Sequence, residues 1–188
     1  MNSRPSIDTL GADLRTLRKS RGLTLSEVAE ILGRSVGWLS QVERDLSKPS
    51  INDLRQIAAV LDVPVSMLFG QAPAPSNEAG SIVRKDARRP LGSGEAGLIE
   101  ELLSPDLTDD FEVVHSTFEP GAAIQTPVSR PTQEVGYMIS GTLDLEINGA
   151  WYRVNQGDSF RIKGTPFRWS NPTQELAVAI WVIAPPVY

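Results

Sequence analysis

Hydrophobic residues recur every three or four positions over the first seventy residues of the chain, and every second position in much of the rest. Ile7, Leu10, Leu14 and Leu17 form the apolar stripe of a first helix, because this spacing returns to one helical face. Comparable stripes predict four further helices, over 24–32, 35–44, 50–61 and 66–69. The first part of the chain is therefore expected to form a small helical domain.

Two of these helices begin with the same polar signal. Thr24 is followed three positions later by Glu27, and Ser50 is followed three positions later by Asp53. In such a capping box the hydroxyl accepts a hydrogen bond from a free backbone amide, and the carboxylate accepts one from the capping residue's own amide. Gly33 then supplies the permissive backbone of a sharp turn between the second and third helices.

The pattern changes beyond residue 81. Residues 71–81, QAPAPSNEAGS, are rich in Pro, Ala, Gly and Ser and lack periodicity, which is typical of a linker. The runs that follow, such as EVVHSTF, GTLDLEING and ELAVAIWVI, alternate apolar and polar residues between Gly, Pro and Asn. They indicate the strands of a β-sandwich or barrel. We therefore divide the chain into a helical domain (1–70), a linker (71–81) and a β domain (82–188).

The composition excludes several kinds of site. The 188 residues include no cysteine and one histidine, so disulfide scaffolds, thiolate catalysis and metal sites with several histidines from one chain are excluded. Without a signal-type or membrane-spanning apolar segment, the sequence predicts a cytoplasmic protein that does not enter a membrane. The net charge is −5, but the acidic excess lies beyond residue 71, which leaves the helical part close to neutral. A nucleic-acid contact there would be a compact patch.

The second and third predicted helices carry the offsets of a helix-turn-helix. Ala29 is small where two helices touch, Gly33 lies in the turn, and Leu39 and Val42 anchor the third helix. The rest of that helix is left to face a major groove, where Gln41 is suited to an adenine edge. The expected DNA-binding residues are Ser35, Val36, Gly37, Ser40, Gln41 and Arg44 on the helix, Ser47 and Lys48 after it, and Ser26 at the start of the second helix.

The segment from Thr24 to Phe69 resembles the five-helix, lambda-repressor-like DNA-binding domain of the XRE family of bacterial transcription regulators. The resemblance implies double-stranded DNA as a partner. It also implies an ion pair between Arg18, on the first helix, and Glu43, at the end of the recognition helix. Gly37 departs from the family, because it removes a side chain from a position that is often used for base contact and lowers helix propensity.

The β domain resembles a cupin, an all-β jelly-roll barrel. Gly121, Glu134 and Gly141 have the spacing of the first cupin motif, and Gly157, Gly164 and Asn171 that of the second. The resemblance places metal-binding histidines at 127, 129 and 167, where this chain has Pro127, Ser129 and Phe167. Glu134 alone would not retain a transition metal. We therefore expect no metal, no cofactor and no cupin-type catalysis.

The remaining groups suit an organic ligand. If side chains alternate from Glu134 along each strand, the barrel mouth is lined by Pro127 and by the expected ligand-binding residues. A ligand amine would face Glu134, and its apolar body would face the rings. An alternative interpretation is that the same side chains fill the interior of the barrel, so that the β domain serves dimerisation alone. The expected ligand-binding residues are Ser129, Glu134, Met138, Phe167 and Trp169.

These features predict a sequence-specific transcription regulator with a metal-free sensor domain for a small organic effector. A homodimer would place two recognition helices about one DNA turn apart, and the effector would favour one dimer geometry. Two alternatives remain open, a constitutive repressor and a metal-dependent cupin enzyme such as an epoxidase, which the histidine content disfavours. The basic run from Arg84 to Arg89 is interpreted as a solvated lead-in to the first strand, with contact to DNA as the alternative.

Overall fold

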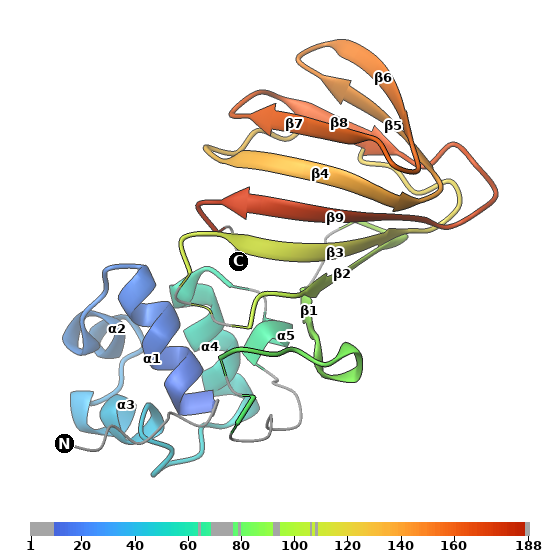
Figure 1. Cartoon of the computed structure of the whole chain (residues 1–188). Coiled ribbons are helices and arrows are strands. Elements are labelled where there is room, and N and C mark those ends of the chain that lie inside the picture. Colours follow the sequence, from blue (N-terminus) through green and yellow to red (C-terminus); the bar gives the residue numbers. More distant parts are fainter. Residues whose placement is uncertain are drawn as a thin grey trace. The chain divides into compact units, whose positions relative to one another are not determined.

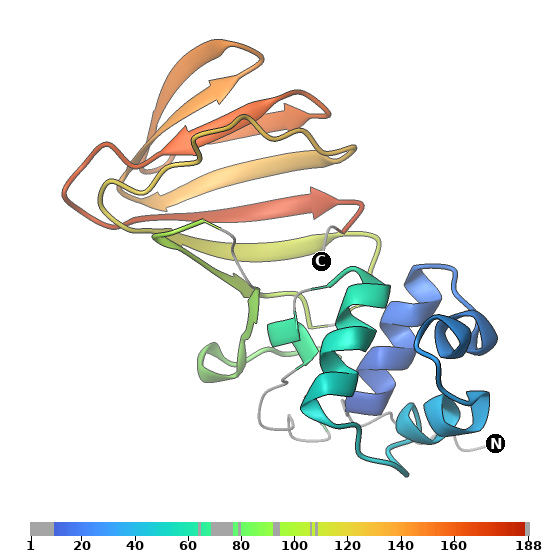
Figure 2. The same cartoon turned by 180° about the vertical axis from the view of Figure 1, so that it is seen from behind.

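The computed structural model describes residues 10–63, 65–68, 77–78, 80–91, 95–105, 107 and 109–186. It contains two compact units, one built from Met1–Arg89 and Pro105–Asp109 and the other from Pro90–Ser104 and Asp110–Val187, whose elements are shown in Figures 1 and 2. Several parts of the sequence predictions lie outside the described residues: Ile7 of the first stripe, most of the linker, Phe69 and the last two residues of the chain.

The first unit is helical, as predicted. Four helices of seven to eleven residues are followed by a single four-residue turn, so the fifth predicted helix is shorter than a regular helix. The core contains apolar side chains from all five elements, including Leu17, Val28, Leu39, Ile57 and Met67. The elements are α1 (Leu10–Ser20), α2 (Leu25–Ile31), α3 (Val36–Val42), α4 (Ile51–Leu61) and α5 (Val65–Leu68).

Both predicted capping boxes are present. The Thr24 hydroxyl accepts a hydrogen bond from the amide of Glu27 at 3.2 Å, and the Glu27 carboxylate accepts one from the amide of Thr24 at 2.7 Å. Ser50 and Asp53 repeat the arrangement at the start of α4. These bonds hold the pKa of both carboxyl groups below their usual values. The polar signals in the sequence therefore fix where α2 and α4 begin.

The second unit consists of two antiparallel sheets. One has the order β1-β2-β3-β9-β4-β7 and the other the order β6-β5-β8. The strands are β1 (Arg89–Leu91), β2 (Leu98–Leu102), β3 (Glu112–Phe118), β4 (Gln133–Ser140), β5 (Thr142–Ile147), β6 (Ala150–Asn155), β7 (Ser159–Lys163), β8 (Phe167–Ser170) and β9 (Ala177–Ala184), with a short 3₁₀ helix at Lys85–Ala87.

The predicted jelly-roll barrel is therefore not closed in the structure, because the described strands do not form one continuous hydrogen-bonded ring. The chain passes from the large sheet to the small one at Gly141, between β4 and β5, where φ is +75°. A Cβ at Gly141 would lie 2.7 Å from Ala177 Cα and from the carbonyl oxygen of Leu176. This sharp bend, which glycine permits, separates the sheets, and side-chain packing joins them.

The core of the second unit lies between these sheets. Successive residues of β3, β4 and β9 alternate between buried and more exposed positions. Val114, Met138, Trp169 and Trp181 belong to the buried cluster. Phe118 packs edge-on against Trp169, with ring centroids 4.7 Å apart. The alternation predicted from the sequence thus gives each sheet one face toward the core.

Candidate DNA-binding surface and effector cavity

The recognition helix α3 is fixed at its start and along its inner face. The hydroxyl of Ser35 accepts a hydrogen bond from the backbone amide of Trp38 at 3.1 Å, so Ser35 is the N-cap and not the first helical residue. Leu39 and Val42 are buried, as predicted. Gly33 in the preceding turn has φ +62°, a conformation that favours glycine. These features turn the opposite face of α3 outward.

Most of the residues expected to contact DNA are exposed on and around α3. Val36, Gly37, Gln41 and Arg44 are exposed, and Ser40 is half-buried. The Arg44 Nε donates to the carbonyl oxygen of Ser40 at 3.0 Å. In the loop after α3, Lys48 is exposed and Ser47 is half-buried, while Ser26 is exposed in the first turn of α2.

A buried ion pair holds the end of the recognition helix. Arg18 Nε lies 2.6 Å from Glu43 Oε1, and the second guanidinium nitrogen lies 2.9 Å from Glu43 Oε2. Arg18 also donates to the carbonyl oxygen of Leu23 at 2.8 Å. The hydrogen bonds with Glu43 raise the pKa of the Arg18 guanidinium. The ion pair implied by the family resemblance is confirmed, and its two-bond geometry fixes orientation as well as distance.

Sequence reasoning missed Arg34, a basic side chain beside the recognition helix. Its guanidinium carbon lies 5.0 Å from the centroid of the Trp38 ring. The same side chain forms an ion pair with Asp53 at 2.6 Å and remains about half exposed. An arginine four positions before an aromatic residue at the start of a helix was the available signal, because cations stack on aromatic faces. Arg34 thus has its charge paired within the fold, whereas Arg44 and Lys48 are the exposed basic side chains on and after α3.

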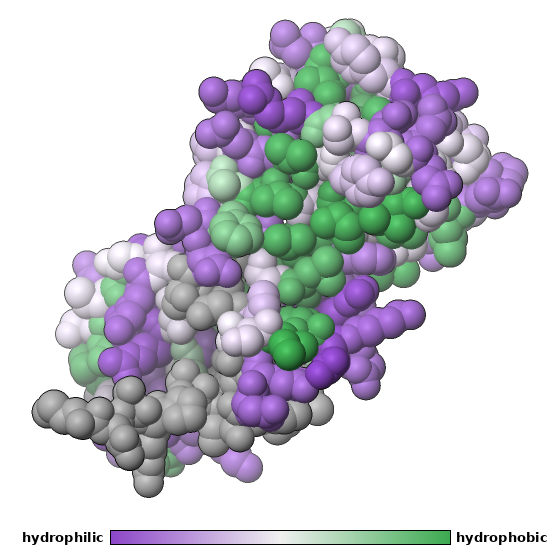
Figure 3. All heavy atoms as spheres, viewed as in Figure 1, coloured by the Kyte–Doolittle hydropathy of each residue, from purple (hydrophilic) through white to green (hydrophobic). Residues whose placement is uncertain are grey.

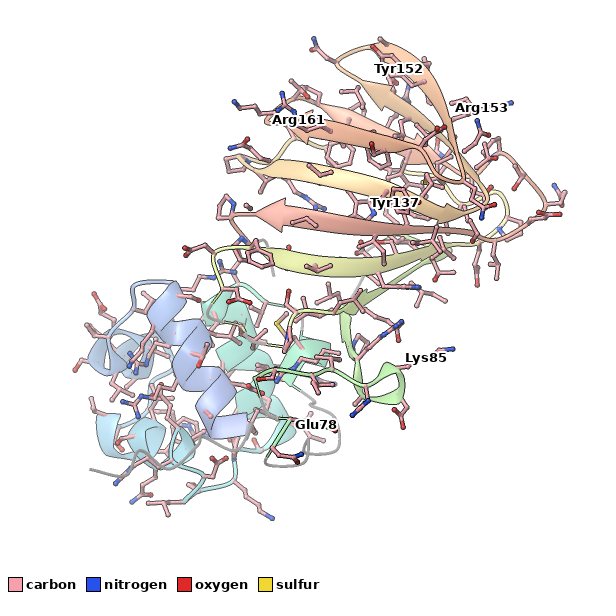
Figure 4. All side chains as sticks on the ribbon, in the orientation of Figure 1. Glu78, Lys85, Tyr137, Tyr152, Arg153 and Arg161 are labelled. Atoms are coloured by element: carbon pink, nitrogen blue, oxygen red, sulfur yellow. The ribbon has the colours of Figure 1, made fainter. Side chains whose placement is uncertain are left out.

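The first arginine of the basic run from Arg84 to Arg89 forms an ion pair with a residue before the run. Arg84 lies 2.5 Å from Glu78, and this pairing raises the pKa of the arginine. Lys85 is exposed beside it, as Figure 4 shows. An arginine already bonded to a carboxylate is less available to a phosphate group, which favours the solvated interpretation of this run.

The second unit contains a cavity of about 190 Å³ between its sheets. Of the residues predicted to bind a ligand, the structure brings together Glu134, Phe167 and Trp169. The lining residues are Glu95, Leu98, Glu100, Phe118, Ile124, Val128, Arg130, Glu134, Phe167, Trp169, Trp181 and Ile183. The cavity therefore combines aromatic walls with three carboxylates and one guanidinium.

Three of the predicted lining positions lie elsewhere. Met138 is fully buried in the core, whereas Pro127 and Ser129 are exposed. Val128 exchanges backbone hydrogen bonds with Phe167 at 2.8 and 2.9 Å, and its side chain lines the cavity. Because neighbouring residues of an extended segment point to opposite sides, Pro127 and Ser129 point away from the cavity. The Ser129 hydroxyl is 3.4 Å from the carbonyl oxygen of Gly164.

The carboxylates of the cavity differ in their surroundings. Glu134 is only 2% exposed, and it accepts a hydrogen bond from the Thr132 hydroxyl at 2.6 Å. Glu100 accepts one from the Ser116 hydroxyl at 3.1 Å. Burial raises the pKa of Glu100, and the nearby charge of Glu134 raises it further, whereas Arg130 lowers it. The charge of one carboxylate therefore affects the protonation of another within the same cavity.

Sequence reasoning missed Glu100, Arg130 and Trp181 as cavity residues. Glu100 lies on β2, whose register with β3 places it opposite Ser116. That register is a long-range pairing, so the sequence LIEEL alone does not show which of its two glutamates faces inward. Trp181 packs in the core, and its ring also contributes to the cavity wall.

The cavity does not have the ligands of a cupin metal centre. Of the four positions that the motif uses, Pro127, Ser129 and Phe167 offer no imidazole, and Glu134 is the remaining ligand group. Across the part of the chain that the structure describes, no group of three or more His, Cys, Asp or Glu side chains could hold a metal ion. Transition metals need several nitrogen, sulfur or carboxylate ligands, so these residues do not fit one.

The two units together define a class of protein, a transcription regulator with a helix-turn-helix domain and a cupin domain. A family model described as a helix-turn-helix domain matches residues 9–68, and one described as a cupin domain matches residues 114–183. The regulator SutR of Escherichia coli K12 is 32% identical over 153 residues, covering 81% of this chain and 80% of SutR. This chain therefore belongs to the XRE-type family of HTH-type transcriptional regulators that carry a cupin domain.

Two further comparisons agree with this assignment. The HTH-type transcriptional regulator PuuR of Escherichia coli K12 is 27% identical over 165 residues, covering 86% of each chain. An RmlC-like cupin from Shewanella frigidimarina matches 56% of this chain and 91% of its own, with a TM-score of 0.50 and 19% identity. The last likeness concerns the fold of the second unit alone. No helix within the described residues is long and apolar enough to cross a membrane.

Proposed function

We propose that this regulator binds double-stranded DNA sequence-specifically as a homodimer, with α3 in the major groove. The observation that carries the proposal is the fixed outward face of α3, held by the Ser35 cap and by the bidentate pair of Arg18 and Glu43. A recognition element must be rigid to distinguish base edges, because a loosely held side chain loses its geometric selectivity. The protein acts where bacterial DNA lies, in the cytoplasm.

The exposed residues divide into two roles. Gln41 is able to form paired hydrogen bonds with an adenine edge, and Val36 is suited to contact with a thymine methyl group. Ser26, Ser47 and Lys48 are suited to contact with phosphates, and Arg44 to contact with phosphate or guanine. The hydroxyl of Ser35 is already bonded to the Trp38 amide, so its part is to position α3. Gly37 adds no side chain to the groove.

The test compares Gln41→Ala with Lys48→Ala. Both variants are titrated against an operator selected in vitro and against random DNA, with fluorescence anisotropy as the readout. Gln41→Ala is expected to cost about 1–3 kcal/mol on the operator and little on random DNA. Lys48→Ala is expected to weaken both and to lower the salt dependence by about one counterion. Equal losses for both variants on both DNAs would contradict the assigned roles.

We further propose that the cavity of the second unit binds a small organic cation as effector. Its volume of about 190 Å³ exceeds that of an engineered cavity of about 150 Å³ that accepts benzene. Aromatic side chains on several strands provide apolar walls. A molecule of about the size of one ring, with a short polar arm, is compatible with this space.

The charge of the cavity favours an ammonium group. Burial is the main cause of the raised pKa of Glu100, and the negative charge of Glu134 adds to it. A cation between the two carboxylates relieves the repulsion between them and replaces solvent lost on burial. The rings of Trp169 and Trp181 also attract a cation through their faces. A carboxylate-bearing ligand would have Arg130 alone as its charged partner among the residues that line the cavity.

The effector proposal is tested by thermal unfolding with matched pairs of small amines and alcohols, such as benzylamine and benzyl alcohol. A ligand that binds the native state raises the melting temperature by mass action. We expect amines to stabilise the wild type more than their alcohols, and Glu134→Gln to lose this difference. If no compound of either kind stabilises the protein, the constitutive-repressor alternative is favoured, because the residues around the cavity would then serve packing alone.

The regulator acts without a catalytic metal in this proposal, and effector binding shifts the population of dimer geometries. The donor set of the cavity argues against the metal-dependent enzyme alternative. Metal analysis of the purified protein tests this: stoichiometric iron, nickel or zinc would contradict it, and trace amounts that do not scale with protein concentration would agree with it.

A further inference from the structure

The outer face of the six-stranded sheet is apolar over its central strands. The residues that alternate with the core positions of β3, β9 and β4 point away from the cavity, and the strand register aligns them in rows. Figure 3 shows hydrophobic residues gathered over this unit. Two rows cross three strands: Val113, Val182 and Val135 in one, and His115, Ile180 and Tyr137 in the next. We name these six residues and Ile139 the outer patch.

The outer patch is more exposed than packing within one chain requires. Val135 is 46% exposed, Tyr137 47%, Ile139 44% and Val182 42%. Isolated exposed apolar residues are common, but a contiguous apolar surface on a soluble protein marks an interaction site. The patch lies on the side of the sheet opposite the effector cavity, so it is separate from that site.

The two margins of the patch carry opposite charges. On one side, strand β7 places Arg161 in register with Val135 and Lys163 in register with Gln133. On the other side, strand β2 places Glu101 in register with His115. Residues in register across antiparallel strands point to the same face of the sheet. The outer patch therefore has two basic residues on its β7 margin and one acidic residue, Glu101, on its β2 margin.

We propose that a second copy of this chain covers the outer patch, with a two-fold axis running along β9. This inference rests on the proposed homodimer and specifies its interface. In a two-fold dimer the same surface is used by both copies. Strand β9 lies between β2–β3 and β4–β7. A two-fold rotation about an axis along β9 therefore places the β7 edge of one copy over the β2 edge of the other. The basic margin of each copy then lies opposite the acidic margin of the other.

The alternative two-fold axis, across the strands, is disfavoured by charge. It would place β7 over β7 and β2 over β2, so that Arg161 would face Arg161 and Glu101 would face Glu101. Like charges brought together at an interface oppose association. The distribution of charge across the strands therefore favours the two-fold axis along β9.

The size of the face is sufficient for a stable dimer. Five adjacent strands, from β2 to β7, span roughly 19 Å at ordinary strand spacing, and the eight residues of β4 extend roughly 27 Å. With side-chain relief, this plane approaches the roughly 800 Å² per partner of a standard interface. Face-to-face packing with nearly aligned strands is also a common arrangement of two sheets.

The first test places a charge in the centre of the patch and compares it with a matched substitution. Figure 4 shows Tyr137 on β4 and Tyr152 on β6, and the two side chains are similarly exposed, at 47% and 54%. The mass of each full-length variant is measured by light scattering across a dilution series. Tyr137→Asp is expected to raise the dimer dissociation constant by about tenfold or more, while Tyr152→Asp leaves it unchanged. Circular dichroism checks that both variants are folded.

The second test examines the orientation by charge reversal. Arg161→Glu and Glu101→Arg are each expected to weaken the dimer, because each creates a like-charge pair across the interface. The double variant is expected to regain dimer affinity, since opposite charges face each other again. Arg153→Glu, on β6 of the other sheet, serves as the control and should leave the dimer unchanged. Failure of the double variant to recover would overturn the axis along β9.

The oligomeric state of the wild type and of Tyr137→Asp separates this interface from the proposed homodimer. A wild-type protein that remains monomeric with and without operator DNA overturns the homodimer and this interface together. A wild-type dimer that Tyr137→Asp does not weaken overturns the interface alone. The contact of Gln41 with bases and the binding of amines at Glu134 are measured separately, and a dimer formed through another face would leave both unchanged.

Discussion

Both units of this protein bury glutamates, and the surroundings of Glu43 and Glu134 differ. Glu43 in the helical unit is 7% exposed and is held by two hydrogen bonds from Arg18. Glu134 in the β unit is 2% exposed, accepts a hydrogen bond from the Thr132 hydroxyl, and lines a cavity. The first carboxylate has its counter-charge within the fold. The second has a hydroxyl partner and open space beside it.

This difference separates a structural acid from a candidate recognition acid. A buried charge needs compensation, and a cation from the same chain supplies it at Glu43. At Glu134 a ligand cation would do so. Residue type and burial are therefore insufficient to assign a role to an acidic side chain, and the partner of the carboxylate decides it.

The largest effect is expected from removing the internal cation. Arg18→Met leaves Glu43 buried and unpaired, so the helical unit should lose about 3–5 kcal/mol of unfolding free energy. Glu134→Gln should change the stability of the β unit by less than about 1 kcal/mol, because the amide oxygen still accepts from Thr132. Urea unfolding followed by hydrogen exchange reports each unit separately. Comparable losses for the two variants would remove the distinction between the two glutamates.

One glycine in each unit lies close to the atoms of a neighbouring element. A Cβ at Gly11 would lie 2.5 Å from the backbone oxygen of Val42, whereas one at Gly136 would lie 2.1 Å from the ring of Phe160. A ring is able to shift more readily than the backbone, so Gly11→Ala should cost more than Gly136→Ala, within the range of about 1–3 kcal/mol for overpacking. Thermal melting of both variants checks the order, and the reverse order would contradict it.

Acid titration should also separate the units. The caps lower the pKa of Asp53 and Glu27, so their contribution is present above the unfolded values and is lost as the pH falls through the folded values. Burial raises the pKa of Glu100, so its protonated form favours folding, and this contribution is lost as the pH rises through the folded value. Glu100→Gln should flatten the pH dependence of the β unit, measured by hydrogen exchange, and leave that of the helical unit unchanged.

The smallest effect is expected at Gly37 on the recognition helix. A Cβ there would meet only the Ser35 hydroxyl oxygen, at 4.0 Å, and the backbone is helical. Gly37→Ala should therefore stabilise the helical unit by about 0.5–1 kcal/mol. Denaturant unfolding measures this gain, and a destabilised variant would show that the position is constrained by contacts other than those of its own helix.

The helical unit was largely predictable from the sequence because its signals are local. Thr24 and Glu27 are three residues apart, and the anchors Leu39 and Val42 follow helical spacing. The ion pair of Arg18 and Glu43 spans 25 residues, and it was reached through the family resemblance.

The β unit was predictable in outline only. The alternation of β3, β4 and β9 located the core, but the separation into two sheets depends on where the chain bends at Gly141. The cavity depends on register: Val128 replaces Pro127 and Ser129 in its lining, and Glu100 enters through the pairing of β2 with β3. A shift of one residue reverses which side chains point inward, and long-range pairing sets that register.

The coupling between the cavity and DNA binding is tested most directly by measuring operator affinity by fluorescence anisotropy, with and without the amine that stabilises the protein most in the thermal screen. The wild type and Glu134→Gln are compared under identical salt conditions. We expect the amine to shift the operator dissociation constant of the wild type but not that of Glu134→Gln, and the two proteins to bind the operator equally without amine. An equal shift in both proteins would contradict the role assigned to Glu134.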